Sequence, residues 1–228
     1  MLEELKQQVY EANLLLPKQG LAVLAWGNAS GFDRESGLFV IKPGGVPYEA
    51  LRPKDMVVVD LDGKRVEGFF HPSSDAPTHA VLYKEFPEIG GIVHTHSPWA
   101  TSWAQAGRDI PCYGTTHAEY FYGAIPCIRS LTAPEIETDY EKNTGIVLAR
   151  EFEASGTDYR IVPAALMRNR GAFTWGRDAS EAVQYAVVLE EVAKMAAQCE
   201  QLNPQCRPIA QELLDKHYYK KHTVGDET

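Results

Sequence analysis

The sequence predicts an α/β fold. Stretches with apolar residues at helical spacing alternate with short apolar runs that are typical of strands. The 228 residues are 44% hydrophobic and 23% charged, which is ordinary for a globular protein with a substantial core. No internal repeat, low-complexity linker or domain boundary divides the chain. We therefore expect residues 1–228 to form one domain.

In the first half, the opening segment carries leucine, valine and alanine at helical spacing as far as Pro17. The apolar runs that follow are short enough for strands. Asp62-Gly63 is a strong turn signal, so the runs on either side of it should form a β-hairpin. A polar loop then leads into a short helical pattern. These patterns predict a helix at 2–18, strands at 22–26, 38–41, 56–61 and 64–68, and a helix at 78–86.

The second half opens with two glycines and the β-branched pair Ile92-Val93, which predict a strand over 90–97. Asp178 and Glu181 have the spacing of a capping box and mark the start of a long helix that continues towards Pro204. The remaining patterns predict helices at 98–106, 134–154 and 208–220 and a strand at 159–166.

His94 and His96 end the strand predicted over 90–97. Side chains at i and i+2 leave the same face of a strand, so the two imidazoles should lie side by side. A catalytic zinc-type site usually takes three protein ligands, so this pair is half a metal site. Two structural histidines bonded to backbone would give the same pattern. Acidic and hydroxyl residues crowd the segments at 73–75 and 115–119, which favours a functional site.

Three segments have features of an anion-binding site. Lys42 precedes Gly44-Gly45, where the glycines let the backbone approach a ligand and the lysine supplies positive charge. Gly27-Asn28 offers backbone N–H groups and an amide. Ser73-Ser74-Asp75 precedes a helix, and the hydroxyls and the helix N-terminus suit an anion. Tight turns at the first two segments and simple N-capping at the third are the structural alternatives.

The net charge of −9 argues against a general nucleic-acid binder, because phosphate backbones need a basic face. An anionic substrate would therefore need a local positive pocket. No apolar run approaches the length of a membrane span, and no signal peptide precedes the first polar helix. We expect a cytoplasmic protein that binds neither nucleic acid nor membrane.

Several short segments together make the chain similar to the class II aldolase/adducin family over nearly its whole length, and most closely to the sugar-phosphate epimerases of that family. Their order and spacing carry the resemblance. The resemblance implies a three-layer α/β/α sandwich around a mostly antiparallel sheet, and a cyclic homotetramer with active sites between subunits. The segments are Trp26-Gly27-Asn28, Ile41-Lys42-Pro43, Pro72-Ser73-Ser74-Asp75, Gly91–Ser97, Thr115-Thr116-His117-Ala118, Tyr120-Phe121-Tyr122-Gly123 and Leu213–Tyr218.

The same resemblance implies a role for each candidate site residue. His94 and His96, with Asp75 beside them, would bind zinc or another divalent metal. Asp75 and Glu119 would be the catalytic acid/base pair. Family aldolases usually carry glutamate at the position of Asp75, so the aspartate favours an epimerase. The substrate phosphate would be held by residues that match Gly27, Asn28, Lys42, Gly44, Gly45, Ser73 and Ser74.

The implied reaction is inversion of carbon 4 of a phosphorylated pentulose such as L-ribulose 5-phosphate, a step of carbohydrate metabolism such as arabinose catabolism. Carbon 4 is not adjacent to the carbonyl, so its proton is not acidic enough for simple removal. The bond between carbons 3 and 4 would break in a retro-aldol step and re-form on the other face of the aldehyde. A metal would stabilise the enediolate, and two acid/base side chains would exchange the hydroxyl proton.

The chain departs from the family pattern at Arg170, which stands where the family has its third metal histidine. Arginine keeps its proton at ordinary pH and has no lone pair for a metal. The usual three-histidine site therefore cannot form. We expect either that Asp75, or less favourably His117, completes a weaker site, or that the guanidinium replaces part of the metal's charge.

Two further departures concern the substrate and the subunit contact. Family epimerases carry a catalytic tyrosine in a C-terminal tail, whereas no tyrosine follows Tyr219, and Gly44 stands where a serine is common. Two alternatives to an epimerase therefore stay open. One is an aldolase that releases a stable aldehyde, and the other is a catalytically impaired protein that binds a sugar phosphate.

Overall fold

The computed structural model describes residues 2–223. The C-terminal tail, where the family's catalytic tyrosine is missing, includes residues 224–228, which lie outside the described residues. None of the helices within 2–223 is both long and apolar enough to cross a membrane. In chain order the elements are α1 (Glu3–Lys18), β1 (Asn28–Asp33), β2 (Leu38–Ile41), η1 (Tyr48–Ala50), η2 (Pro53–Asp55), β3 (Val57–Asp60), β4 (Arg65–Glu67), α2 (Ala76–Glu85), β5 (Gly91–Thr95), α3 (Pro98–Ala106), α4 (Thr115–Ala118), β6 (Cys127–Ile128), α5 (Ala133–Ser155), β7 (Ala164–Met167), β8 (Gly171–Gly176), α6 (Ala179–Leu202) and α7 (Gln211–Thr223).

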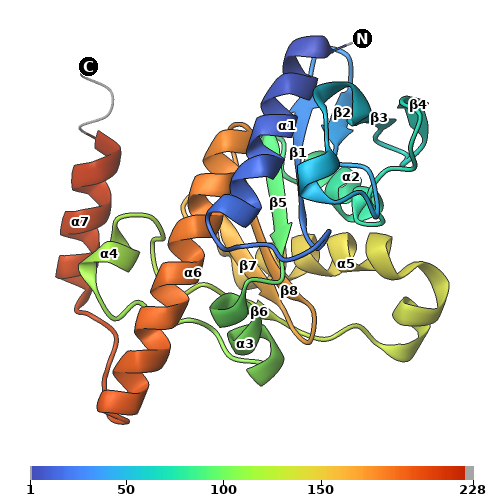
Figure 1. Cartoon of the computed structure of the whole chain (residues 1–228). Helices are drawn as coiled ribbons and strands as arrows, with labels where there is room; N and C mark the ends of the chain where they lie inside the picture. The colour runs from blue at the N-terminus through green and yellow to red at the C-terminus, as the bar shows by residue number, and fades with distance from the viewer. Residues whose placement is uncertain (1, 224–228) are drawn as a thin grey trace.

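The strands form one mixed sheet in the order β4-β3-β2-β1-β5-β8-β7-β6 (Figure 1). Neighbouring strands are antiparallel except β6 and β7, which are parallel. The predicted α/β class and the mostly antiparallel sheet are therefore confirmed. Strand β5 lies in the interior of the sheet, where His94 is opposite Asn28 on β1 and Phe173 on β8.

Alternating side chains divide the hydrophobic core between the two faces of the sheet. On β5, Ile92 packs in a cluster with residues of α2 and α5, whereas Val93 packs in a cluster with residues of α1 and α6. Towards β7, the second face is covered by α3 and the later turns of α6. Because His94 follows Ile92 by two residues, its side chain belongs to the face that α2 and α5 cover.

Most of the predicted elements are present. The helix predicted at 2–18 is α1, the hairpin at 56–68 is β3 and β4, and the helices predicted at 98–106 and 134–154 are α3 and α5. The backbone of α5 breaks at Asp139. At the start of α6, the Asp178 carboxylate accepts a hydrogen bond from the Glu181 amide at 2.8 Å, as the capping pattern predicted. The strand predicted at 159–166 begins later, at Ala164.

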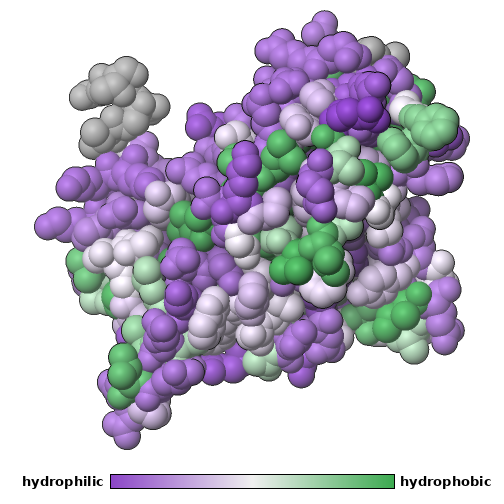
Figure 2. Space-filling model, viewed as in Figure 1, coloured by the Kyte–Doolittle hydropathy of each residue, from purple (hydrophilic) through white to green (hydrophobic). Residues whose placement is uncertain are grey.

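The prediction of a buried strand at 22–26 is wrong. This segment is an irregular loop between α1 and β1, and the side chains of Val23, Leu24 and Trp26 are 57%, 73% and 56% exposed. Leu24 has a φ of 58°, in the left-handed region that a regular strand excludes. Figure 2 shows hydrophobic side chains on the face of the molecule where Figure 1 draws this loop. An exposed apolar run thus precedes β1.

Candidate functional site

The two histidines of β5 lie together, as the strand periodicity predicted. Their ring centroids are 4.8 Å apart, and the His94 ring stacks on Phe173 at 4.2 Å. Nδ1 of His94 lies 2.9 Å from the Ala172 carbonyl oxygen, which can only accept, so Nδ1 carries the proton and Nε2 keeps its lone pair. Burial lowers the pKa of both imidazoles, which keeps them neutral near pH 7.

Asp75 faces this histidine pair from the start of α2. Its side chain does not cap the helix. Instead Asp75 Oδ2 accepts a hydrogen bond from Asn28 Nδ2 at 2.7 Å, and the same amide nitrogen donates to Ser73 Oγ at 3.1 Å. The N-capping alternative for Asp75 is therefore excluded. Burial acts to raise the pKa of the Asp75 carboxyl. At the acidic pH where Asp75 titrates, attraction to the protonated His94 and to Arg170 outweighs burial, and that pKa lies below its ordinary value.

Lys42 supplies a buried cation on the segment whose backbone bonds to Ser73. Its Nζ lies 3.3 Å from the Ala25 carbonyl oxygen and 4.8 Å from the centre of the Tyr48 ring. Burial lowers the pKa of this ammonium to about 8. The Tyr48 hydroxyl donates to the Gly27 carbonyl at 2.9 Å and so ties the loop before β1 to the segment after β2.

The three predicted anion-binding segments are brought together. The Ser73 amide donates to the Lys42 carbonyl at 3.0 Å, and Pro43 forms an isolated antiparallel bridge with Pro72. Gly27 has a φ of 75°, and a Cβ there would lie 2.8 Å from the His94 carbonyl oxygen, so this position requires glycine. The remaining members of the set, Gly44, Gly45 and Ser74, are exposed beside these segments.

Arg170 lies in the turn between β7 and β8 and reaches into the same cluster. Its Nη2 donates to Asp75 Oδ1, and its Nη1 donates to Thr144 Oγ1 at 2.6 Å. Its guanidinium carbon lies 4.7 Å from the centre of the Tyr140 ring and 5.6 Å from that of Phe173, the ring on which His94 stacks. The side chain is 9% exposed, so the guanidinium is a fixed and nearly dry charge.

The zinc site implied by the family resemblance does not fit these residues. His94 and His96 can offer ring nitrogens, but the two oxygens of Asp75 accept hydrogen bonds from Asn28 and Arg170. Within residues 2–223, no three His, Cys, Asp or Glu side chains are grouped so that they could hold a metal ion. A divalent cation beside the imidazoles would also be repelled by the adjacent guanidinium. The class II aldolase family is generally dependent on a divalent metal. The ligand set of Asp75, His94 and His96 stays a prediction, and the Arg170–Asp75 ion pair opposes it.

Glu119 and His117 lie apart from this cluster. Glu119 is 3.4 Å from Nδ1 of His217 on α7, and Nε2 of His117 donates to the Gly123 carbonyl at 2.8 Å. In Figure 1, α4 lies beside α7, with α6 between α4 and β5 in this view. His117 therefore does not complete a metal site with His94 in the same chain, and Glu119 does not face Asp75 within one chain.

The sequence patterns miss the residues that fix Arg170 and Lys42. Thr144 is 26 residues from Arg170 and lies, like Tyr140, within the long α5, where nothing local marks either residue as functional. Tyr48 lies in the short η1 turn. The roles of Thr144, Tyr140 and Tyr48 follow from their contacts with the buried Arg170 and Lys42 side chains. Those contacts depend on the tertiary fold.

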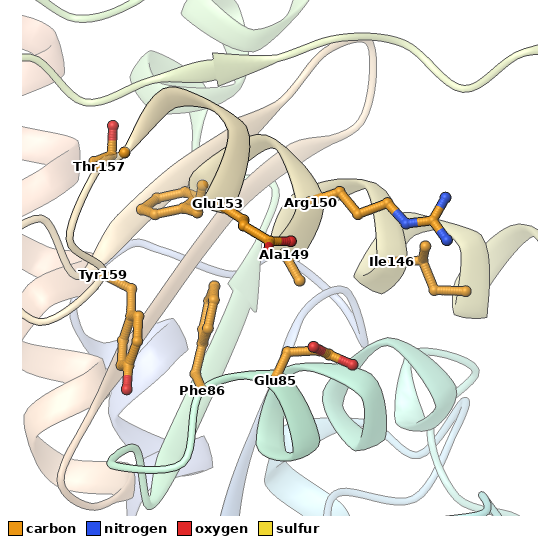
Figure 3. A pocket seen from close by; sticks show the side chains of 10 residues that line it. Glu85, Phe86, Ile146, Ala149, Arg150, Glu153, Thr157 and Tyr159 are labelled. Carbon is orange, nitrogen blue, oxygen red and sulfur yellow. The ribbon is translucent and has the colours of Figure 1, made fainter.

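A hollow of about 680 Å³ lies between the end of α2 and the second half of α5, away from the histidines (Figure 3). Phe86, Phe152 and Tyr159 form its apolar wall, and Glu85, Arg150 and Glu153 line its polar side. None of its lining residues belongs to the predicted site. The candidate chemistry is therefore concentrated at Asp75, His94 and Arg170, with Lys42 on the adjoining segment.

Comparisons with known proteins extend the resemblance. The chain is 52% identical over 224 residues to the L-ribulose-5-phosphate 4-epimerase UlaF of Salmonella paratyphi C, covering 97% of this chain and 96% of that protein. Its fold is similar to that of an L-fuculose 1-phosphate aldolase, with a TM-score of 0.80, 24% identity and 95% of each chain covered. It is also similar to YgbL from Klebsiella pneumoniae, with a TM-score of 0.75, 22% identity and 95% and 99% of the two chains covered. The model of the class II aldolase and adducin N-terminal domain matches residues 7–197. The chain therefore belongs to the class II aldolase and adducin family.

Proposed function

We propose that the protein is a sugar-phosphate epimerase that converts L-ribulose 5-phosphate to its carbon 4 epimer. The observation that carries the proposal is that Asp75 and the His94–His96 pair lie together at the end of β5, with the backbone of Lys42 bonded to Ser73 on the adjoining segment. The 52% identity to an epimerase over nearly the whole chain supports it. The buried Asn28 Oδ1 has no hydrogen-bond partner within residues 2–223 and can accept one from a substrate hydroxyl.

The chain's own residues divide the work of a retro-aldol cleavage and re-addition. Lys42, with the exposed segments around Gly44 and Ser74, would hold the phosphate. The aldehyde fragment would then stay bound while it rotates to present its other face. Asp75 would take the proton of the carbon 4 hydroxyl on one face. Glu119, from a second subunit, would act on the other face.

The assembly and setting follow from the same proposal. We propose a homotetramer with active sites between subunits, because Glu119 lies apart from Asp75 within one chain and the apolar loop of Leu24 and Trp26 is exposed beside the site. The Trp26 and His96 rings are 6.3 Å apart, so a subunit that covers this loop would also approach the histidines. A single domain, a three-layer α/β/α sandwich and a cytoplasmic location remain part of this proposal.

The proposal is tested by following L-ribulose 5-phosphate with the purified protein by ¹³C NMR. We expect the carbon 4 epimer to appear without accumulation of free aldehyde. Accumulated glycolaldehyde phosphate would identify an aldolase instead. The Arg170–Asp75 ion pair favours a second candidate, a protein that binds the sugar phosphate without turnover, and calorimetric binding with an unchanged NMR spectrum would select it.

The metal content of the purified protein is a separate prediction. We expect less than about a tenth of an equivalent of zinc after incubation with zinc and gel filtration, because two imidazoles alone bind weakly. Arg170→His should raise the bound zinc towards one equivalent, since it restores a third imidazole at the position where the family has one. Mass spectrometry of the metal measures both values, and Arg168→His, two residues away and exposed, is the matched control.

A further inference from the structure

The proposed reaction needs a positive charge where the enediolate forms, and Arg170 is the cation that the structure fixes beside His94. Its guanidinium is held by Asp75 and Thr144 and lies against the rings of Tyr140 and Phe173. The bond to Thr144 and the two ring contacts hold the guanidinium in place, so that only its anionic partner changes when charge develops nearby. A structural ion pair on the surface would show neither the burial nor the aromatic contacts.

We propose that the Arg170 guanidinium binds the enediolate oxygens and replaces the metal, so that this chain cleaves and re-forms the carbon–carbon bond without a divalent cation. This inference rests on the proposed epimerase function. The planar guanidinium presents parallel N–H donors that match a pair of oxygens, as it does for a carboxylate. Arg170 can therefore do for two adjacent oxygens what a Lewis acid does in other enzymes.

The charges balance through the step. The Asp75 carboxylate takes the proton of the carbon 4 hydroxyl, and the oxygen electron pair forms the aldehyde carbonyl. The electrons of the bond between carbons 3 and 4 move to form the carbon 2–carbon 3 double bond, and the former carbonyl oxygen at carbon 2 becomes negative. The negative charge thus passes from Asp75 to the enediolate, while Arg170, next to Asp75, neutralises first one and then the other.

In the re-addition step the electron pairs move in the reverse direction, and carbon 3 of the enediolate attacks the opposite face of the aldehyde. The carbon 4 alkoxide then takes its proton from Glu119 of a neighbouring subunit, and exchange with solvent restores the starting protonation of both carboxyl groups. Arg170 regains Asp75 as its partner when the anion disappears. The ion pair that disfavours metal binding is, in this mechanism, the resting state of the catalyst.

The test uses the full-length protein, dialysed against EDTA and shown by mass spectrometry to be free of metal, with L-ribulose 5-phosphate as substrate. We expect wild-type turnover in EDTA to be within about twofold of turnover with added zinc. Arg170→Ala should lower kcat by about 100-fold or more with a much smaller change in KM, as for loss of an oxyanion contact. Guanidinium chloride at millimolar concentration should restore part of that loss, whereas zinc should not. Arg168→Ala is the matched exposed control.

The outcomes separate this inference from the epimerase function. Wild-type activity that is lost in EDTA and restored by zinc overturns the role of Arg170 and leaves the epimerase function standing. Activity in EDTA that survives in Arg170→Ala does the same. No turnover with or without zinc overturns both proposals. If Arg170→Ala does not fold, Arg170→Lys, which keeps the charge but loses the fork, should fold and retain a reduced, metal-independent kcat.

Discussion

Lys42 shows how one residue can be recognised from the sequence while its properties come from the fold. The glycines after it predicted an anion site, but the burial of its ammonium under Tyr48 and beside the Ala25 carbonyl depends on a loop that is distant in sequence. That burial lowers its pKa to about 8. A phosphate ester that binds there replaces lost hydration with a direct charge interaction.

The pKa of Lys42 predicts how the reaction depends on pH. Above about pH 8 the free enzyme loses the ammonium proton, so attraction for the substrate phosphate weakens and kcat/KM should fall. Lys42→Arg keeps its charge at these pH values and should flatten the alkaline limb. Steady-state kinetics between pH 6.5 and 9.5 measure both profiles. An alkaline limb unchanged in Lys42→Arg would assign the titration to another group.

At the scale of elements, the sequence predicts well where a local rule decides. The Asp62-Gly63 turn fixed the hairpin, and the spacing of Asp178 and Glu181 fixed the start of α6. Prediction from the sequence fails where contacts with residues distant in the chain decide the structure. The apolar run at 22–26 is exposed beside the site, whereas β1, with Asn28 and Ser30, is buried because those polar groups bond to Asp75 and His79. Their partners lie 47 and 49 residues away.

The cap of α6 gives a prediction at this scale. Asp178→Ala removes the acceptor for the Glu181 amide, so the free energy of unfolding should fall by about 1 kcal/mol. Asp178→Asn keeps an acceptor and should lose clearly less. Urea unfolding monitored by circular dichroism measures the difference between the two variants. Equal losses in both would mean that the charge at the helix N-terminus, rather than the hydrogen bond, provides the stabilisation.

At the scale of the whole molecule, the candidate site is divided. Asp75, His94 and Arg170 lie on one side of the chain, and Glu119 lies with His217 at the junction of α4 and α7. The family resemblance assigns Asp75, His94 and Glu119 to one active site, but the sequence carries no local signal of which of them meet within one chain. Only the geometry separates the two groups.

This division predicts complementation between inactive subunits. Asp75→Asn and Glu119→Gln should each abolish most activity alone. When equal amounts are unfolded and refolded together, about a quarter of the sites should combine an intact Asp75 from one subunit with an intact Glu119 from another, if subunits assemble at random in a closed ring. Activity should therefore recover to about a quarter of wild type. Each variant refolded alone is the control. Recovery no greater than the mean of the two variants would show that one chain supplies the whole site, or that Glu119 takes no part in the reaction.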